Sequence, residues 1–271
     1  MQLVSSLLPV SAVVLTFNSD RTLREVLHSL RFCREIVIVD SGSTDRTLAI
    51  AEYFNCTILK RKLVGFGEQK DFGVKNAKYD WIFVVDSDEI VSPALHSEIL
   101  KLFHVKPMTS VAYSVPIQLY FLGHPIYHSG QRSKKSIRLF DRRHAHFDQA
   151  LVHETVMVKT GESIPLKGPL HHYSYLCLED YFTKLNRYTT LGAEDMAKRS
   201  LPTKRYKVVT SFPFQFLKFY ILKFGFLDGY YGFLWCMLSA FYPVVKYAKH
   251  EDLCFPTSSI MAFSETVKST L

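Results

Sequence analysis

An apolar run that ends in three carboxylates constrains the fold of this chain more than any other feature. Residues 81–85 read Trp-Ile-Phe-Val-Val, and Asp86, Asp88 and Glu89 follow within four positions. A run of this length and composition is typical of a strand buried on both faces, as in a parallel sheet. Ligands of open α/β sheets bind outside the carboxyl ends of the strands. We therefore expect Asp86 and Asp88 to lie at a binding site.

Two readings of the acidic pair remain open at this point. Two carboxylates one residue apart at a strand end can share a hard divalent cation, which prefers oxygen ligands and often retains substrate phosphates in its shell. The same residues also fit a solvated acidic turn that caps a helix opening at Pro93. A single Asp-x-Asp does not decide between a metal site and a cap.

The segments around this run alternate between strand and helix patterns. Such alternation predicts βαβ units and a parallel sheet. Polar side chains at Asn18, Asp40 and Asp86 follow three of the predicted strands and so describe a ligand crevice. We expect strands over residues 9–17, 35–39 and 56–59, and helices over 23–30, from the turn at 40–45 to about 54, and over 68–77.

The second half changes in character. We expect one or two strands over 110–122, a strand over 136–140 and a helix over 179–198. Residues 212–223 mix bulky aromatics with spaced lysines, which is typical of a helix lying in a membrane interface. Residues 229–245 are uncharged and leave interfacial, spanning and buried placements open. The stretch from about residue 256 is expected to be a poorly ordered tail.

The formal net charge of +8 is concentrated in two places. Six basic residues lie between 132 and 143, and nine lie between 198 and 249 against one acid, Asp228. Such patches attract phosphates or anionic lipid. They lie among bulky apolar residues and carry no recognition motif, so we expect no nucleic-acid partner. Five scattered cysteines without a Cys-x-x-Cys pair favour a reducing compartment.

Two common phosphate-binding motifs are missing. No Gly-x-Gly-x-x-Gly follows the first predicted strand, and the chain has no Gly-Lys-Ser/Thr loop. A bound nucleotide would therefore be held by carboxylates at its base and ribose, and by a metal at its diphosphate.

Three motifs in this order resemble the family 2 glycosyltransferases with the GT-A fold: 16–18 (Thr-Phe-Asn), 39–45 (Val-Asp-Ser-Gly-Ser-Thr-Asp) and 85–88 (Val-Asp-Ser-Asp). The resemblance is strong over about 10–105. Residues 65–70, the stretch from 138 to 154 and the C-terminal aromatic-basic region look like bacterial lipopolysaccharide core glucosyltransferases, which add glucose to the inner-core heptose.

The resemblance implies a fold, a donor and a cofactor. The fold would be α/β of GT-A type, a Rossmann-like, mainly parallel sheet flanked by helices, followed by a C-terminal helical membrane-associating region. The donor would be a nucleotide sugar, UDP-glucose, with Mg²⁺ or Mn²⁺ bound by Asp86 and Asp88. The residues implied for the nucleotide sugar are Thr16, Asn18, Asp40, Ser41, Asp45, Gln69, Lys70 and Asp86.

The same resemblance suggests catalytic and phosphate-binding groups in the second half. An inverting transfer needs a base that takes the proton of the acceptor hydroxyl. Glu154 is the candidate for it, and Asp148 is the second choice. A late histidine, His172 or its neighbour His171, would be a metal or diphosphate ligand, although a structural histidine fits equally well. Arg132, Lys135 and Arg138 would neutralise phosphates of the leaving group or acceptor, or else belong to a solvated basic face.

Two positions depart from the family pattern. Ser41 stands where many relatives have a second aspartate, which leaves Asp40 as the main contact to base or ribose. Asp71 stands where close relatives carry asparagine, and nothing in the sequence says what that changes.

Together these observations predict an inverting, metal-dependent hexosyltransferase acting on a lipid-linked saccharide. It would be cytoplasmic and peripheral, on the inner face of the cytoplasmic membrane and its anionic surface. The alternatives are transfer to a polyprenyl phosphate and a non-catalytic nucleotide-sugar-binding membrane protein. We expect a glycosyltransferase domain over 1–200, a helical membrane-interface region over 201–255 and a tail over 256–271.

Overall fold

The computed structural model describes residues 7–104, 111–131, 134–147, 156–159 and 162–255. The chain forms two compact units, of which the first comprises residues 1–119 with 133–173, and the second comprises residues 120–132 with 174–271. These limits differ from the predicted boundary at residue 200, because the helix that follows residue 177 belongs to the second unit. The predicted division into domains stays a prediction.

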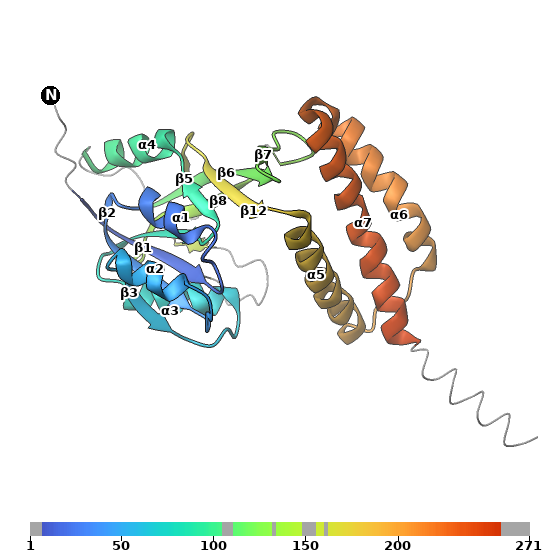
Figure 1. The fold of residues 1–271 in the computed structure, drawn as a ribbon, viewed down its shortest axis with the longest axis horizontal. Coiled ribbons are helices and arrows are strands. Elements are labelled where there is room, and N and C mark those ends of the chain that lie inside the picture. Colours follow the sequence, from blue (N-terminus) through green and yellow to red (C-terminus); the bar gives the residue numbers. More distant parts are fainter. Residues whose placement is uncertain (1–6, 105–110, 132–133, 148–155, 160–161, 256–271) are drawn as a thin grey trace, which may run out of the picture. The chain divides into compact units, whose positions relative to one another are not determined.

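The first unit is built on a twisted sheet whose first half is parallel (Figure 1). Its parallel strands lie in the order β3-β2-β1-β4. The sheet then continues in the order β8-β6-β12-β5, in which β8 is antiparallel to β4 and to β6, and β12 is antiparallel to β5. The strands of the described chain are β1 (Leu8–Thr16), β2 (Cys33–Asp40), β3 (Thr57–Lys60), β4 (Trp81–Asp86), β5 (Glu89–Val91), β6 (Ala112–Phe121), β7 (His124–Pro125), β8 (Lys135–Asp141), β9 (Ala145–Phe147), β10 (Val156–Val158), β11 (Ile164–Pro165) and β12 (Leu170–Tyr175). Strands β9 and β10 pair with each other in a separate small sheet.

Helices cover both faces of this sheet, as the apolar run at 81–85 predicts. In β4, Phe83 and Val85 pack into one core, and Ile82 and Val84 pack into another. Successive strand side chains point to opposite faces, so each core lies on one side of the sheet. The helices of the first core are α1 (Leu23–Ser29), α2 (Thr47–Tyr53) and α4 (Pro93–His104), and the helix of the second core is α3 (Phe66–Asn76).

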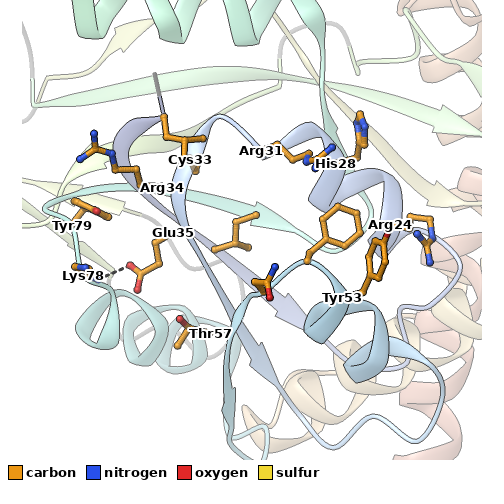
Figure 2. A pocket seen from close by; sticks show the side chains of 14 residues that line it. Arg24, His28, Arg31, Cys33, Arg34, Glu35, Tyr53, Thr57, Lys78 and Tyr79 are labelled. Atoms are coloured by element: carbon orange, nitrogen blue, oxygen red, sulfur yellow. Dashed lines mark hydrogen bonds between the residues drawn. The ribbon is translucent and has the colours of Figure 1, made fainter. Parts of the chain in front are cut away.

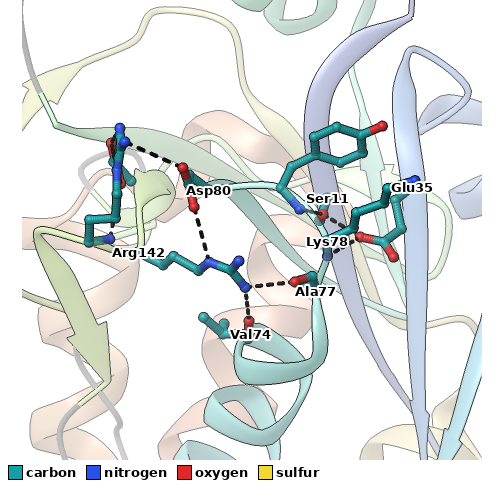
Figure 3. A network of polar contacts seen from close by, with 10 residues as sticks. Ser11, Glu35, Val74, Ala77, Lys78, Asp80 and Arg142 are labelled. Atoms are coloured by element: carbon teal, nitrogen blue, oxygen red, sulfur yellow. Dashed lines mark hydrogen bonds and ion pairs between the residues drawn. The ribbon is translucent and has the colours of Figure 1, made fainter.

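Helix α3 lies close against the sheet because it carries a glycine at the contact. A Cβ atom at Gly73 would lie 2.5 Å from Val13 Cγ1 and 2.8 Å from Val39 Cγ2. The carboxyl end of α3 is held by Arg142, whose Nη1 donates to the carbonyl oxygens of Val74 (3.0 Å) and Ala77 (2.7 Å) (Figure 3). A basic side chain near the carboxyl end of a helix can hydrogen-bond its last carbonyls. The position of α3 fixes the residues that it carries toward the site.

The second unit consists mainly of three helices, α5 (Leu178–Lys198), α6 (Arg205–Leu217) and α7 (Gly229–Cys254). Helices α6 and α7 form a hairpin joined by a π-helical turn (Lys218–Leu222) and a short 3-10 helix (Gly225–Asp228). Phe121, Tyr175, Tyr181 and Trp235 form an aromatic cluster within this unit. Residues 212–223, which were expected to form an interfacial helix, make up the end of α6 and the π-helical turn that follows it. Within the described residues, no helix is both long and apolar enough to cross a membrane.

Candidate active site

The acidic pair lies where β4 ends, and two cations hold its first member. Asp86 Oδ1 lies 3.3 Å from Lys70 Nζ of α3, and Oδ2 lies 3.1 Å from Arg138 Nη2 of β8. Burial by itself would raise the pKa of Asp86, but Arg138 and Lys70 hold it well below its usual range. Asp86 is therefore ionised at neutral pH. Its charge is already compensated by the protein.

A third carboxylate, Glu89, contacts both Arg138 and the backbone of Asp86. Glu89 is fully buried; its Oε1 accepts a hydrogen bond from Arg138 Nη2 (2.5 Å) and its Oε2 accepts one from the backbone nitrogen of Asp86 (2.9 Å). Burial raises the pKa of Glu89 and the charge of Asp86 adds to the increase, while Arg138 opposes it. Glu89 thus positions both the arginine and the backbone of the acidic turn. Sequence reasoning assigned it no role; its signal was a third acid directly before the apolar pair Ile90-Val91.

Pairing between β5 and β12 brings the late histidine to the acidic turn. His172 lies opposite Glu89 in this antiparallel pair, and the backbone nitrogen of Tyr173 donates to the carbonyl oxygen of Asp88 (2.8 Å). His172 Nε2 lies 3.3 Å from Asp88 Oδ1. His171 occupies the next register position, opposite Ile90, and points to the other face. Of the two histidines, the structure brings His172 to Asp88.

The donor set at this point fits a metal held jointly by protein and diphosphate. Among the residues that the structure describes, no three or more His, Cys, Asp or Glu side chains form a metal cage. Mg²⁺ needs no such cage, because it usually binds one or two carboxylates together with substrate phosphates. Asp88 and His172 offer an oxygen and a nitrogen ligand, and about a quarter of each side chain is exposed. Asp86 is a less available ligand because Lys70 and Arg138 already hold it.

The loop after β2 lies at the same end of the sheet as Asp86, because β1 pairs in parallel with both β2 and β4, and Asp40 orders this loop. Asp40 Oδ1 accepts from Thr16 Oγ1 (2.9 Å) and Ser43 Oγ (2.5 Å), and Oδ2 accepts from the backbone nitrogens of Gly42 and Ser43 (both 2.9 Å). Burial tends to raise the pKa of Asp40, but these hydrogen bonds lower it overall. A carboxylate has about four acceptor positions, and all four are used here. The prediction that Asp40 contacts uridine stays a prediction; in this structure Asp40 shapes the loop.

Neighbouring predicted residues also hold the loop. Asn18 adopts a left-handed backbone conformation (φ 48°), and its Oδ1 accepts from the backbone nitrogen of Thr44 (2.8 Å). Asp45, the residue before the N-cap of α2, accepts through Oδ1 from the backbone nitrogen of Thr47, the first residue of that helix (2.9 Å). Gln69 is fully buried, and its Nε2 donates to Ser41 Oγ (3.2 Å). Their roles toward a nucleotide stay predictions.

Of the remaining predicted residues, the structure describes only Lys135. Lys135 is exposed at the start of β8, three residues before Arg138. Glu154, Asp148 and Arg132 lie outside the described residues, so their proposed roles stay predictions.

The first unit has a hollow at the opposite end of β2 from Asp40 (Figure 2). It has a volume of about 780 Å³ and is lined by cations, aromatic rings and Glu35. The Glu35 carboxylate accepts from Ser11 Oγ (2.5 Å) and from the backbone nitrogen of Lys78 (2.6 Å). Ligands of parallel sheets bind at the carboxyl ends of the strands, and this hollow is at the amino end. We therefore take Asp86, Asp88 and His172, at the carboxyl ends of the strands, as the candidate site.

The comparisons with known proteins agree with the fold. The chain belongs to glycosyl transferase family 2, whose model matches residues 11–155, more than half of its length. It is therefore a glycosyltransferase, and its α/β sheet with flanking helices is the GT-A fold that the motifs imply.

Two curated relatives match nearly the whole chain. The lipopolysaccharide core biosynthesis glycosyltransferase LpsC of Rhizobium meliloti (strain 1021) is 29% identical over 89% of this chain and 92% of its own. An uncharacterized glycosyltransferase of Rickettsia typhi is 25% identical over 93% and 90%. Among solved structures, residues 1–349 of Staphylococcus aureus TarS cover 90% of both chains at 15% identity, with a TM-score of 0.42.

A pH dependence of stability follows from the His172–Asp88 contact. Burial lowers the pKa of His172, but Asp88, Glu89 and Asp86 together raise it above the ordinary value of 6.5. A raised folded-state pKa means that the protonated histidine stabilises the fold fully below pH 6.5, and that this contribution is lost as the pH rises through the folded-state value. We expect the free energy of unfolding of the metal-free protein to decline as the pH rises from 6.5 through the folded-state pKa of His172. Urea titrations at a series of pH values measure it.

The matched variant for this experiment is His172→Gln, which keeps a polar side chain but cannot titrate. Its unfolding free energy is expected to lack the decline above pH 6.5 that the wild type shows. Equal pH profiles for the two proteins would contradict an ion pair between His172 and Asp88.

Proposed function

We propose that this glycosyltransferase moves glucose from UDP-glucose to a saccharide of the lipopolysaccharide inner core, with inversion at the anomeric carbon. The reaction would depend on Mg²⁺ or Mn²⁺. The observation that supports it best is the arrangement at the end of β4, where Asp88 and His172 lie 3.3 Å apart beside an Asp86 that two cations hold. The name of the relative LpsC, which matches over most of both chains, supports the class of acceptor.

The chain's own residues would divide the work in the following way. Asp88 and His172 would bind the metal, which stabilises the negative charge of the leaving diphosphate. Lys70 and Arg138 hold Asp86 ionised and keep positive charge beside the place where that diphosphate would lie. The loop ordered by Asp40 would surround the base and ribose. Glu154 would take the proton of the acceptor hydroxyl as its oxygen attacks the sugar.

The proposed acceptor would bring the enzyme to a membrane surface. A lipopolysaccharide core is carried on a lipid, so the enzyme would work at the inner face of the cytoplasmic membrane. The nine cations between residues 198 and 249 would favour its anionic surface.

Turnover of a panel of nucleotide sugars tests the proposal directly. Purified full-length protein is incubated with UDP-glucose, UDP-galactose, UDP-N-acetylglucosamine and GDP-mannose, each with Mn²⁺ and with EDTA, and release of the nucleotide is measured. We expect release of UDP from UDP-glucose that depends on the metal and increases when lipopolysaccharide inner-core acceptor is added. Equal release with EDTA, or preference for another donor, would contradict the metal or the donor.

Replacing the proposed base distinguishes a sugar hydroxyl from a polyprenyl phosphate as the acceptor. We expect Glu154→Gln to lower kcat for transfer to a sugar hydroxyl by about 100-fold, the lower part of the range for a general base. Binding of UDP-glucose, measured by calorimetry, should stay unchanged because the base acts on the acceptor. Asp148→Asn is the matched control, since it removes the charge of the second candidate.

Unchanged transfer in Glu154→Gln would remove Glu154 from the mechanism. If transfer to a polyprenyl phosphate were then found, the acceptor would already be anionic and would need no base, and the inner-core assignment would be wrong.

A further inference from the structure

The turn between α6 and α7 carries a concentration of exposed apolar side chains. We call residues 218–230 the hairpin tip. Six of its large apolar or aromatic side chains are between 44% and 71% exposed, namely Ile221, Leu222, Phe224, Phe226, Leu227 and Tyr230. Single exposed apolar residues are normal on a protein surface, but a contiguous group usually marks an interaction site.

The hairpin tip is a braced structure. Asp228 accepts hydrogen bonds from the backbone nitrogens of Tyr127 (3.3 Å) and His128 (2.8 Å), and its Oδ1 lies 2.8 Å from His128 Nδ1. The backbone nitrogen of Ser129 donates to the carbonyl oxygen of Lys223 (2.9 Å). The segment 127–129 thus fastens both ends of the turn.

Close packing inside the hairpin tip adds to this bracing. A Cβ atom at Gly225 would lie 2.5 Å from Cys236 Sγ, and one at Gly232 would lie 2.2 Å from the carbonyl oxygen of Gly225. Phe224 is held in the left-handed region (φ 56°) while its ring is 56% exposed. Such a conformation is costly for a bulky residue and persists only where the surroundings enforce it. The fold therefore presents these side chains to the outside in a fixed form.

The charges around the hairpin tip indicate what covers it. Asp228 is the one acid between residues 198 and 249, and its side chain is 2% exposed because it faces the 127–129 segment. Lys218 and Lys223 lie within the tip itself. The exposed surface is thus apolar and cationic. A second copy of the chain would bring the same cations and be repelled, whereas a bilayer with anionic lipid offers both hydrocarbon and negative charge.

We propose that the hairpin tip inserts into the headgroup region of an anionic bilayer and anchors the enzyme by its end, with α6 rising out of the membrane. This deepens the proposed function, because it names the segment through which the enzyme reaches a lipid-linked acceptor. The placement differs from a helix that lies flat in the interface. In a flat arrangement, Val209 on α6, which is 76% exposed, would be as important as the tip.

Vesicle binding of full-length variants tests the proposal. The variants are Leu222→Asp with Phe224→Asp in the tip, and Val209→Asp as the control of matched exposure on α6. Aspartate tolerates the left-handed conformation at position 224, so the tip should keep its shape. Partitioning is measured by co-sedimentation with vesicles of phosphatidylcholine alone and of phosphatidylcholine mixed with phosphatidylglycerol.

We expect wild type to bind the phosphatidylglycerol vesicles strongly and the neutral ones weakly. The tip double variant should bind about 100-fold less, since burial of each large apolar side chain contributes about a factor of ten. Val209→Asp should bind like wild type. In the Tyr230→Trp variant, brominated lipid should quench the tryptophan fluorescence. All variants should release UDP from the donor at the wild-type rate, which separates failure of the anchor from failure of the proposed function.

Several results would overturn the proposal. These are wild-type binding by the tip variant, equal loss in Val209→Asp, or equal binding to neutral and anionic vesicles. Self-association without lipid, seen by sedimentation velocity and abolished in the tip variant, would instead make the tip an interface between copies.

Discussion

Replacing Asp88 by alanine is expected to lower metal-dependent release of UDP by about 1000-fold, because a metal at a leaving diphosphate contributes several kcal/mol to the barrier. Asp86 should not compensate for the loss. Its two carboxylate oxygens already lie 3.3 Å from Lys70 Nζ and 3.1 Å from Arg138 Nη2. Asp88 has His172 beside it instead, a second side chain that can bind a metal.

The comparison needs two further variants. Asp88→Asn keeps the size of the side chain and removes its charge, and it should lose nearly as much activity as alanine. Asp80→Ala is the matched control: Asp80 precedes the same strand at its amino end and pairs with Arg142 and Arg143 on the surface. Exposed pairs contribute at most about 1 kcal/mol, so this variant should be active and stable.

The measurement is UDP release from UDP-glucose as a function of Mn²⁺ concentration, with Mn²⁺ binding followed separately by calorimetry in the presence of UDP. Loss of Mn²⁺ binding together with loss of turnover supports the metal role. A rate for Asp88→Ala within about tenfold of wild type at saturating Mn²⁺ would remove Asp88 from the metal site.

The largest expected effect on stability comes from Arg138→Met. Arg138 lies between Asp86 and the fully buried Glu89, and it is itself 8% exposed. Removing one partner of a buried pair leaves an uncompensated charge and costs about 3–5 kcal/mol. We expect a loss of that size in the free energy of unfolding, measured by urea titration at pH 7.

A second substitution shows whether the charge is responsible. Glu89→Gln keeps the shape of the side chain and removes its charge, so the double variant Arg138→Met with Glu89→Gln should regain much of the lost stability. Arg205→Met is the matched control, because Arg205 pairs with Glu251 but is 74% exposed. It should lose at most about 1 kcal/mol. Additive losses in the double variant would show that Arg138 and Glu89 do not interact.

Local pattern predicted most of the first unit. The apolar run at 81–85 was confirmed as a strand buried on both faces, and β1 to β4 as the parallel part of the sheet, since period and composition depend on near neighbours in the chain. The same local pattern predicted that polar residues follow or end β1, β2 and β4. Pattern singled out Asp40 and Asp45, but it could not show that their carboxylates hold the loop and the first backbone nitrogen of α2.

What the sequence by itself determined is the chemistry available: an acidic pair after a buried strand, a set of family motifs, and a C-terminal region rich in aromatics and cations. Tertiary structure alone decided which groups meet. Arg138 is 52 positions from Asp86, and His172 is more distant still from Asp88, and both contacts exist because β8 and β12 enter the sheet at particular places. The same holds for Asp228, whose charge is turned inward by a segment 100 positions away. Pairing between distant segments depends on the packing of the whole fold, which no local pattern encodes.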